Sequence, residues 1–513
     1  MSESLTLPTG RLPWWYPTRP RIVILFLVLA VIGGVAWWVW ISTHCASGVR
    51  RVGGECVGVT DGSFVFSPDL ADVLGRIRDE NRWVEQQGEP FVSIAYLVAL
   101  PGEGNDPSDI YRHELQGAYL AQRRANRTNE LGDLPLIRLL VANAGEDNEQ
   151  WRPVVAQLGD RVRSERLVAV AGLGVSLETT RQAIAALTAP ENPDIAVPVI
   201  AARLTSDDFS GVPRFVRVAP TDRDQAQAMV AYLKREPAFR RALLIQDINE
   251  TDLFVRTLGE AFTAEFPDAT HNLLQPVERY DGSLPGLASR FVQMMADICQ
   301  QRPDVIYFAG RGEPLRSFIQ ALPERPCLDL HVTVVTGDSG GAVATALRHA
   351  NEEGERALKA GLGANMALRY TELAHPDAWA AAPGSFPPRA VGYLQENVAG
   401  FPDESLDDGG TIMGHDAVVT AVRAIRSAVA GGQDLMIDAI TPRDVIQALN
   451  GLHGTRAVPG ASGWISLDVG DPVNKAIPIL ELQPDGTVAF LTLSAAGGTP
   501  FIPPSSSELE TQG

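Results

Sequence analysis

Apolar and polar positions follow a regular order from Phe91 onward. Short apolar runs with strand character are each followed by a polar loop and then by a segment with apolar residues at helical spacing. This alternation predicts parallel sheets covered by helices, the α/β class. The first series comprises expected strands at Val92–Leu100, Leu136–Ala144, Leu167–Ala171 and Asp194–Ala202, and expected helices at Arg112–Arg127, Glu149–Ser164 and Ser176–Leu187.

A second series of the same kind begins near Ala242. It comprises expected strands at Ala242–Gln246, Val305–Ala309 and Val332–Thr336, with a helix at Pro314–Ala321. A single hydrophobic core rarely grows beyond roughly 250–300 residues, so we expect 513 residues to form more than one compact unit. The two consecutive series therefore predict two doubly wound parallel-sheet lobes.

The longest apolar run lies near the N-terminus, at Ile22–Ile41. It carries no charge and is close to the roughly 20 residues that a membrane-spanning helix needs. A cleaved signal peptide has a shorter apolar core, roughly 7–15 residues, and a cleavage site of small residues. Here Trp37, Trp38 and Trp40 stand where an interfacial aromatic belt would lie. The run predicts one uncleaved transmembrane helix.

The charges that flank this run bear on its orientation. Arg11, Arg19 and Arg21 precede it and favour a cytoplasmic N-terminus, although Arg50 and Arg51 beyond it weaken the contrast. We therefore expect a single-pass protein of the cell membrane with the bulk of the chain extracytoplasmic.

The segment between the apolar run and the first strand contains a predicted helix from Pro68 to about Gln86. We interpret it as part of a stalk or N-terminal extension. The end of the chain, PFIPPSSSELETQG from Pro500, is polar and rich in proline and serine, which is typical of disorder.

Charge and cysteine content narrow the function classes. The 62 acidic residues outnumber the 43 lysines and arginines and give a net charge of -19, which opposes binding to nucleic acid. The 4 cysteines fall into two locally spaced pairs, Cys45 with Cys56 and Cys299 with Cys327. An oxidising compartment would permit two disulfides. Three connectivities are open, we favour the local one, and free buried thiols are the alternative.

The stretch VTGDSGGAV, Val335–Val343, contains the letters that surround the nucleophile of chymotrypsin-like proteases. Those enzymes are all-β, whereas this stretch joins a predicted strand to a predicted helix. His44, the residue that imitates their catalytic histidine, stands three residues after the end of the apolar run. A strand-to-helix turn does suit the nucleophile elbow of other hydrolases, so a serine hydrolase centred on Ser339 stays a remote alternative.

A second glycine-containing loop, AGLGVSLETT at Ala171–Thr180, begins like a dinucleotide-binding fingerprint. That fingerprint needs a third glycine for close packing of the helix, and this loop has Leu177 there. We expect no cofactor and no metal. Ser176 either caps the following helix or, with the helix amides, attracts a carboxylate or phosphate.

The order of several motifs resembles one family, the type I periplasmic solute-binding proteins, in particular the leucine/isoleucine/valine-binding group. The resemblance covers roughly Phe91–Leu493 and is that of a membrane-anchored bacterial form. It rests on GAYLAQRRAN, AGLGVSLETT, VPVIAARLTSDDF, FVRVAPTDRDQAQAMVAYL, PDVIYFAGRG, ELAHPDAW, GHDAVVTAVRAI and GASGWISLDVGD, in that order.

The resemblance implies two lobes joined by three crossovers, with a ligand held between them at the carboxyl ends of the strands. In amino-acid-binding relatives, lobe one holds the ligand's α-carboxylate through a loop serine and a threonine, which match Ser176 and Thr205. An acidic residue of lobe two binds the α-amino group, and Asp338 lies in the matching loop. A carboxylate facing an ammonium forms a charge-assisted hydrogen bond.

The sequence departs from the family at positions that are often aromatic. Thr251 and Asp252 stand in the first lobe-two loop, and Arg311 follows the next strand. Arg203 adds a second cation in lobe one. Arg203 is alternatively solvated, and Arg311 alternatively pairs with Glu313. If both arginines face the cleft, an acidic or polar ligand is favoured over leucine.

The expected function is that of a noncatalytic solute-binding protein that closes over an amino acid or small acid. An ABC permease and ATPase would be its partners, and a ligand-sensing receptor is the alternative. The expected division is 1–21 cytoplasmic, 22–41 transmembrane, 42–90 stalk, 91–215 lobe one (first part), 216–366 lobe two, 367–462 lobe one (second part), 463–495 C-terminal crossover strands and 496–513 disordered tail.

Overall fold

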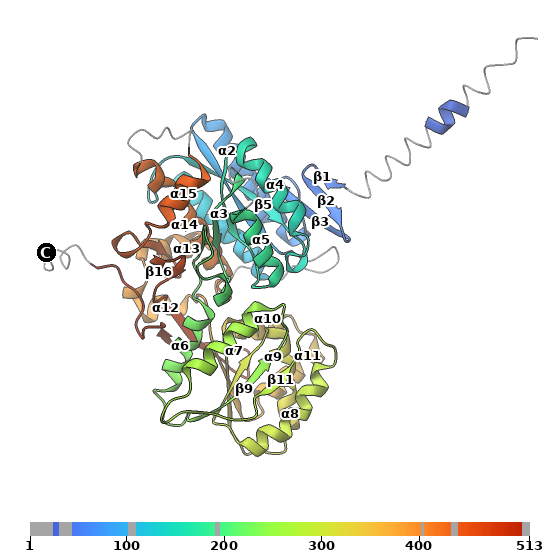
Figure 1. The fold of residues 1–513 in the computed structure, drawn as a ribbon, viewed down its shortest axis with the longest axis vertical. Coiled ribbons are helices and arrows are strands. Elements are labelled where there is room, and N and C mark those ends of the chain that lie inside the picture. The colour runs from blue at the N-terminus through green and yellow to red at the C-terminus, as the bar shows by residue number, and fades with distance from the viewer. Residues whose placement is uncertain are drawn as a thin grey trace, which may run out of the picture.

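The described part of the chain forms two α/β lobes, which lie one above the other in Figure 1. The computed structural model describes residues 24–29, 44–100, 109–189, 195–401, 405–431 and 440–504. Each lobe is built on an 8-stranded sheet. Both sheets are mixed, because antiparallel strands extend the predicted parallel ones.

The parallel part of the lobe-one sheet has the strand order β5-β4-β6-β7-β8. Its strands are β5 (Leu136–Asn143), β4 (Phe91–Val98), β6 (Leu167–Gly172), β7 (Val199–Ala201) and β8 (Phe215–Arg217). Three antiparallel strands precede β5 at the edge, namely β1 (His44–Ala46), β2 (Val49–Val52) and β3 (Glu55–Thr60). The chain direction therefore alternates from β1 to β5 and is constant from β5 to β8.

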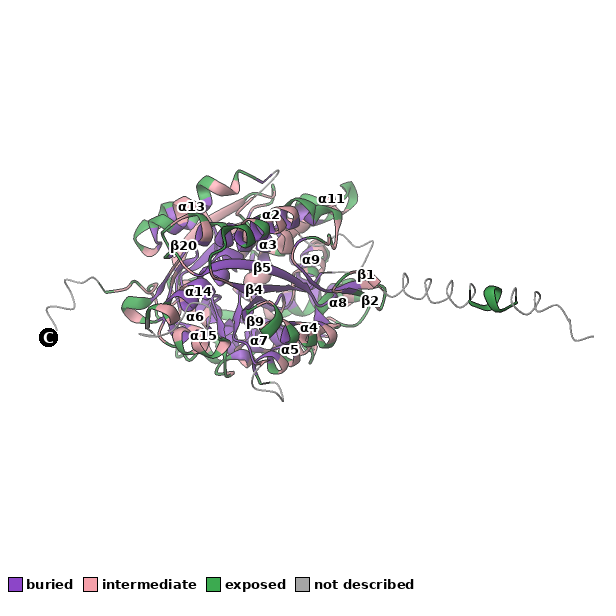
Figure 2. Cartoon of the chain, turned by 90° about the horizontal axis from the view of Figure 1, so that it is seen from above, coloured by how far each residue is buried: buried purple, intermediate pink, exposed green. Residues whose placement is uncertain are grey.

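Helices cover both faces of the lobe-one sheet. Alternate residues of β4 point to opposite faces, as a strand requires: Ile94 and Tyr96 join one apolar core, and Ala95 and Leu97 join another. The first core contains residues of α2 (Ala71–Gln87), α3 (Asp109–Arg127), α12 (Asp377–Ala381), α13 (Pro388–Val398), α14 (Gly410–Gly431) and α15 (Pro442–Leu449), and the second contains residues of α4 (Trp151–Ser164) and α5 (Glu178–Thr188). Figure 2 shows β4 and β5 buried between these helices.

Lobe two repeats the architecture with the strand order β10-β9-β12-β13-β14-β19-β20, and β11 also pairs with β9. Its strands are β9 (Arg241–Asp247), β10 (Asn272–Leu273), β11 (Glu278–Tyr280), β12 (Val305–Ala309), β13 (Val332–Thr336), β14 (Met366–Thr371), β19 (Ile477–Leu482) and β20 (Val488–Ser494). Its helices are α6 (Asp222–Leu233), α7 (Leu253–Glu265), α8 (Leu287–Gln301), α9 (Gly312–Ala321), α10 (Gly341–His349) and α11 (Glu352–Leu362). The strands β9 to β14 are parallel, whereas β19 and β20 are antiparallel additions.

The chain crosses between the lobes after β8, after β14 and before β19. Three predicted boundaries are therefore displaced. Val216 and Arg217 belong to β8 in lobe one, so the first crossing begins at Val218. Residues 367–371 belong to β14 in lobe two, so the second crossing begins at Glu372. Within 463–495, the short hairpin strands β16 (Gly463–Ile465), β17 (Leu467–Asp468) and β18 (Asp471–Pro472) lie outside the lobe-two sheet, with β16 paired to β15 (Val458–Gly460).

The segment interpreted as a stalk is part of lobe one. Strand β3 pairs with β5, and four apolar residues of the predicted helix, Leu70, Val73, Leu74 and Ile77, are at most 1% exposed in the lobe-one core. The helix itself is confirmed, because a 3-10 turn over Pro68–Leu70 leads into α2. The stalk interpretation is wrong because an apolar helix face needs a partner, and the lobe-one sheet provides it.

The substitution Val73→Ala tests this placement. It removes two buried methyl groups, so we expect the free energy of unfolding to fall by about 1.5–2 kcal/mol, measured by urea denaturation. Val65→Ala is the matched control, because Val65 lies in the same segment and is 40% exposed. A stalk separate from the lobes would predict equal, negligible effects for both variants.

The remaining N- and C-terminal predictions fall largely outside the described residues. Of the predicted span 22–41, only residues 24–29 are described, as helix. Within the described ranges, every helix is too short or too polar to span a bilayer. Of the predicted disordered tail, residues 496–504 are described, and the backbone amides of Gly497 and Phe501 donate to Asn474 at 2.8 Å each. This part of the tail is therefore attached to the protein.

Both local cysteine pairs are confirmed as disulfides, Cys45–Cys56 and Cys299–Cys327. The first joins β1 to β3 in lobe one. The second joins the end of α8 to the loop before β13 in lobe two.

A buried polar network ties the third crossing to lobe one. The carboxylate of Asp416 on α14 accepts hydrogen bonds from the amides of Ala461 and Ser462, at 2.8 and 2.7 Å, and lies 2.8 Å from the His415 ring. The Lys475 ammonium donates to the Ser462 hydroxyl at 2.7 Å. Burial lowers the pKa of Lys475 to about 8, although the charge of Asp416 opposes the shift. His415, Asp416, Ser462 and Lys475 are each at most 1% exposed.

Close packing of α3 against α14 holds two acidic residues near the other lobe. A Cβ atom on Gly117 would lie 2.0 Å from the Thr411 carbonyl oxygen, and one on Gly414 would lie 2.2 Å from the Glu114 carbonyl oxygen. Only glycine permits this approach. The contact fixes Glu114 on α3 beside the loop that carries Asp408, just before α14.

Candidate functional site

The two lobes face each other with the carboxyl ends of their parallel strands. Both sheets reverse strand order beside their first parallel strand, β4 in lobe one and β9 in lobe two, and ligands of open α/β sheets bind at such switch points. In lobe two, charged residues follow the ends of four parallel strands: Asp252 after β9, Arg311 after β12, Asp338 after β13 and Glu372 after β14.

A cavity of about 400 Å³ lies between the lobes. Small-molecule sites usually have volumes of about 300–1,000 Å³, so the cavity suits a small ligand. Its charged lining residues are Asp109, Arg203 and Asp408 from lobe one, Arg311 and Asp338 from lobe two, and Glu372 from the second crossing.

Asp338 begins the turn that the sequence marks as GDSGG. Its backbone amide donates to the Gln225 side-chain oxygen at 3.0 Å. Its Oδ1 atom is buried and forms no hydrogen bond with any described residue. Burial raises the pKa of Asp338, although the charges of Arg203 and Arg311 oppose the rise. The carboxyl is therefore a buried acceptor with free capacity at the cavity wall.

Glu372 is the acidic residue that sequence reasoning missed. It is 2% exposed, and its Oε1 atom accepts one hydrogen bond, from the Leu373 amide at 3.0 Å. A Cβ atom on Gly341 would lie 2.5 Å from Oε2, so the glycine leaves room for the carboxylate. Burial raises the pKa of Glu372 well above its usual range, with the Arg203 charge opposing and the Asp338 charge adding to the rise. Within the described chain, neither Glu372 nor Asp338 forms an ion pair.

The sequence did hold a signal for Glu372. It is the first residue of the motif ELAHPDAW and directly follows the apolar strand Met366–Thr371, so the strand-end rule applies to it as it does to Asp338. That motif served only to establish the resemblance.

Arg203 extends from the loop after β7 toward the cavity. Its side chain is 21% exposed and lies 3.7 Å from the Glu114 carboxylate. Glu114 is buried and accepts a hydrogen bond from the Tyr96 hydroxyl at 2.8 Å. Burial raises the pKa of Glu114, and the nearby Arg203 charge and Tyr96 hydroxyl oppose the rise. Arg203 is thus mostly buried, contrary to the solvated alternative, and its contact with Glu114 is longer than a hydrogen bond.

Arg311 lines the cavity, but its charge is already matched. It binds the Asp252 carboxylate through two nitrogens, each at 2.7 Å, and also donates to the Ser176 carbonyl oxygen at 3.3 Å. The alternative pairing with Glu313 is wrong, because Glu313 pairs with Arg316 at 3.3 Å. Arg311 therefore connects the lobes.

Ser176 and Thr205 lie close together, as the resemblance implied, but protein groups surround both. The Ser176 hydroxyl accepts from the amides of Thr205 and Ser206 at 3.2 and 3.4 Å, and its carbonyl accepts from the Leu253 amide of lobe two at 3.2 Å. Both side chains are at most 3% exposed, and neither lines the cavity beside Asp338. Their predicted contact with a carboxylate stays a prediction.

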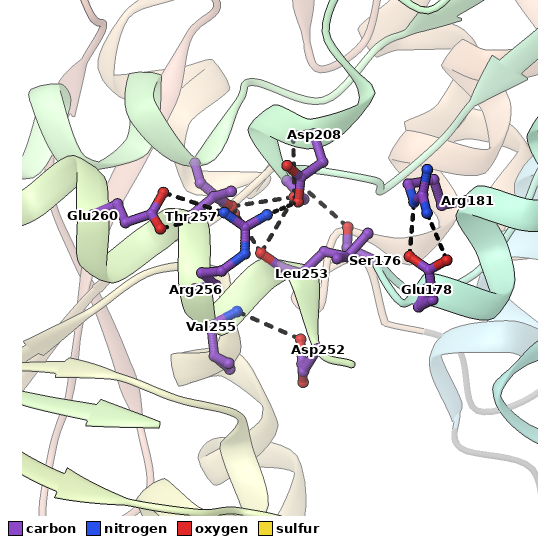
Figure 3. A network of polar contacts seen from close by, with 12 residues as sticks. Ser176, Glu178, Arg181, Asp208, Asp252, Leu253, Val255, Arg256, Thr257 and Glu260 are labelled. Carbon is purple, nitrogen blue, oxygen red and sulfur yellow. Dashed lines mark hydrogen bonds and ion pairs between the residues drawn. The ribbon is translucent and has the colours of Figure 1, made fainter. Parts of the chain in front are cut away.

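Further contacts join the lobes around Ser176 (Figure 3). Arg256 on α7 lies between Glu260 of its own helix and Asp208 of lobe one, with which it forms an ion pair. Thr251 is exposed, donates to the Asn249 side chain at 2.8 Å and lines a separate, outer cavity with Arg311. The structure thus brings Arg203, Arg311 and Asp338 to one cavity and leaves Thr251 outside it.

Ser339 also lines this cavity, within the 3-10 turn Asp338–Gly340. In the described residues it forms no hydrogen bond with a histidine, which a serine nucleophile needs as a base. The other residues of this protease-like stretch have different roles. Asp338 lines the cavity, and Gly340 and Gly341 leave room for the side chains of Tyr370 and Glu372.

The pKa of Glu372 yields a prediction for the ligand-free protein. A carboxyl whose pKa is raised in the folded state contributes stability below its usual value of 4.5 and loses it as the pH rises. Glu372→Gln removes the charge, and its amide oxygen can still accept from the Leu373 amide. We expect the variant to unfold about 2–4 °C above the unsubstituted protein at pH 8, with a smaller difference at pH 4.

Thermal unfolding at the two pH values measures this effect. Glu313→Gln is the control, because Glu313 also follows a lobe-two strand but its side chain is 64% exposed. An equal gain from both variants, or a larger gain for Glu372→Gln at pH 4, would contradict the burial argument.

No protein-family model and no curated protein matches the sequence. Solved structures are similar in fold. The leucine-binding protein LivK of Thermotoga maritima is 18% identical, with a TM-score of 0.56 over 78% of this chain and 98% of that chain. LivJ of Streptococcus pneumoniae, a branched-chain amino acid transporter substrate-binding protein solved with isoleucine, is 15% identical, with a TM-score of 0.55 over 79% and 99%.

A third structure is an ABC transporter substrate-binding protein of Desulfitobacterium hafniense in complex with Leu. It is 15% identical, with a TM-score of 0.54 over 79% of this chain and 100% of that chain. At this level of identity the similarity shows the fold. The predicted resemblance to type I periplasmic binding proteins is confirmed in that sense, and all three of these neighbours are binding proteins.

Proposed function

We propose that the chain is an extracytoplasmic solute-binding protein that closes over a small amino-acid-like ligand and delivers it to an ABC transporter. One observation carries the proposal: a cavity at the switch points of two facing sheets contains charged groups of both signs whose partners are incomplete. Burying such groups costs free energy unless a partner matches them, and a zwitterion would supply both partners.

The ligand's two charges have natural counterparts in the cavity. Arg203 would receive the carboxylate, because its contact with Glu114 is 3.7 Å, whereas Arg311 is fully engaged with Asp252. Asp338 would receive the ammonium through its unpartnered Oδ1 atom. This differs from the arrangement implied by the resemblance, in which Ser176 and Thr205 hold the carboxylate.

Ligand entry would require the lobes to separate. The ion pair of Arg256 with Asp208 crosses between the lobes (Figure 3). The contacts of Arg311 and Leu253 with Ser176 cross there too, so opening breaks all of them. Closure over a ligand would restore them. Hinge motion about the three crossings is the established mode for such two-lobed architectures.

We further propose that residues 22–41 anchor the protein in the cell membrane with the lobes outside. The uncharged apolar run supports this placement, and two disulfides suit an oxidising compartment. Protease added to intact spheroplasts should then degrade the chain, whereas a cytosolic marker should survive. Survival of the chain alongside the marker would contradict the orientation.

Ligand binding is tested with the full chain purified in detergent. A panel of the standard amino acids and small organic acids is added, and thermal unfolding is recorded. A ligand at about 100 times its dissociation constant should add about 2.7 kcal/mol to the free energy of unfolding. If no amino acid changes the unfolding temperature at millimolar concentration, the proposed function fails.

A further inference from the structure

The charges that line the cavity do not balance once the internal ion pairs are removed. Asp109 pairs with Arg112 at 3.1 Å, Asp408 pairs with His113, and Arg311 pairs with Asp252. Three lining groups then remain: Asp338 and Glu372, which form no ion pair in the described chain, and Arg203, whose contact with Glu114 is 3.7 Å long. A ligand with one carboxylate and one ammonium would match the first two and leave Glu372 without a countercharge.

Glu372 is not explained by a structural role. The only hydrogen bond it accepts in the described chain is from the Leu373 amide, and a glutamine would accept it without the cost of burying a charge. Its Oε2 atom lies against Gly341, where a side chain would take up the space. The residue therefore presents a carboxylate oxygen to the cavity from the second crossing, while Asp338 presents one from the neighbouring strand end.

We propose that Glu372 binds a second cationic group of the ligand, so that the preferred ligands are dibasic amino acids such as lysine or ornithine. The inference rests on the proposed function and specifies its substrate class. A neutral amino acid would leave Glu372 buried and unmatched. An acidic amino acid would place its side-chain carboxylate beside the carboxylates of Asp338 and Glu372. Of the three remaining lining groups, Arg203 alone is a cation.

The arrangement of Arg311 removes the sequence-based argument for an acidic ligand. That argument needed both arginines to offer their charges to the cleft. Arg311 does line the cavity, but two hydrogen bonds commit its guanidinium to Asp252. Arg311 therefore has no charge left to offer an acidic ligand.

Calorimetric titration of the full chain in detergent tests the inference. The probes are L-lysine and L-norleucine, which share the α-amino acid group and chain length and differ in the terminal ammonium. A hydrogen bond between charged groups corresponds to roughly a ten- to hundredfold difference in affinity, so lysine should bind more tightly by about that factor. Equal affinities, or tighter binding of norleucine, would overturn the inference.

The variant Glu372→Gln assigns the preference to this residue. It should weaken lysine binding roughly ten- to hundredfold and leave norleucine binding unchanged. Glu313→Gln, on the exposed surface, should change neither. Unchanged lysine binding by Glu372→Gln would remove Glu372 from the site. If that variant does not fold, the comparison of lysine with norleucine on the unsubstituted protein decides alone.

Failure of the inference and failure of the proposed function give different results. If leucine or glutamate binds and lysine does not, the dibasic preference is wrong and the solute-binding function stands. If no amino acid binds, both are wrong.

Discussion

Replacing Asp416 with alanine is expected to lower the free energy of unfolding by about 3–5 kcal/mol, because it removes one partner from a buried charged network. Asp416 accepts hydrogen bonds from two backbone amides, and its negative charge stabilises the buried ammonium of Lys475. The alanine variant leaves the amides of Ala461 and Ser462 without this acceptor and the ammonium without this nearby negative charge. Urea denaturation followed by circular dichroism measures the loss.

The control for this prediction is an exposed acidic residue. Asp329 has a side chain 77% exposed and contacts Arg302, itself 52% exposed, at 3.4 Å. Exposed pairs contribute about 0–1 kcal/mol, so Asp329→Asn should have little effect. A loss below about 1 kcal/mol for Asp416→Ala would show that water or rearrangement satisfies the network, and the buried-charge argument would then be wrong.

Replacing Arg203 with alanine is expected to weaken binding of an amino acid by about 2–5 kcal/mol, or roughly thirty- to several-thousandfold. Arg203 is the cation proposed to meet the ligand's carboxylate, and its removal leaves Glu114, Asp338 and Glu372 close to an anionic group. Arg203→Lys keeps the charge but loses the two-pronged geometry, so an intermediate affinity is expected.

Cadaverine, which is lysine without its carboxylate, separates this role from a general effect on the site. Its affinity should stay the same or increase in Arg203→Ala, because the substitution removes a repulsive cation. Calorimetry measures both ligands, and thermal unfolding verifies that the variant folds. Equal losses for lysine and cadaverine would contradict a specific contact between Arg203 and the carboxylate.

The repeated pattern of strand and helix was sufficient to predict the two lobes. The predicted strands, such as Val332–Thr336, overlap parallel strands of the structure, whereas Met366–Thr371, with Arg369 inside it, was not predicted. The helix Ala71–Gln87 was also predicted, but not its place. Periodicity identifies an apolar face and says nothing about which sheet covers it. The short edge strands His44–Ala46, Val49–Val52 and Glu55–Thr60 are too brief to produce a pattern.

The candidate site was predictable in part. Asp338 and the two arginines line one cavity, as the strand-end rule and the resemblance suggest. The pairing of Arg311 with Asp252 was not predictable, because both follow strand ends and only the three-dimensional spacing decides which charges meet. Glu372 was missed for a similar reason. Asp338 stands 34 positions earlier in the sequence, and only the pairing of β13 with β14 shows that the two residues follow neighbouring strands.

Strand pairing across the second and third crossings also determines when, during synthesis, each lobe can fold. The sheet of lobe two is completed by β19 and β20, which come from the last tenth of the chain, and lobe one needs α14 from residues 410–431 to cover its core. Neither lobe can therefore close while the ribosome still holds the C-terminal part, although most proteins fold their N-terminal domain first. Both sheets therefore stay incomplete until synthesis of the chain is nearly finished.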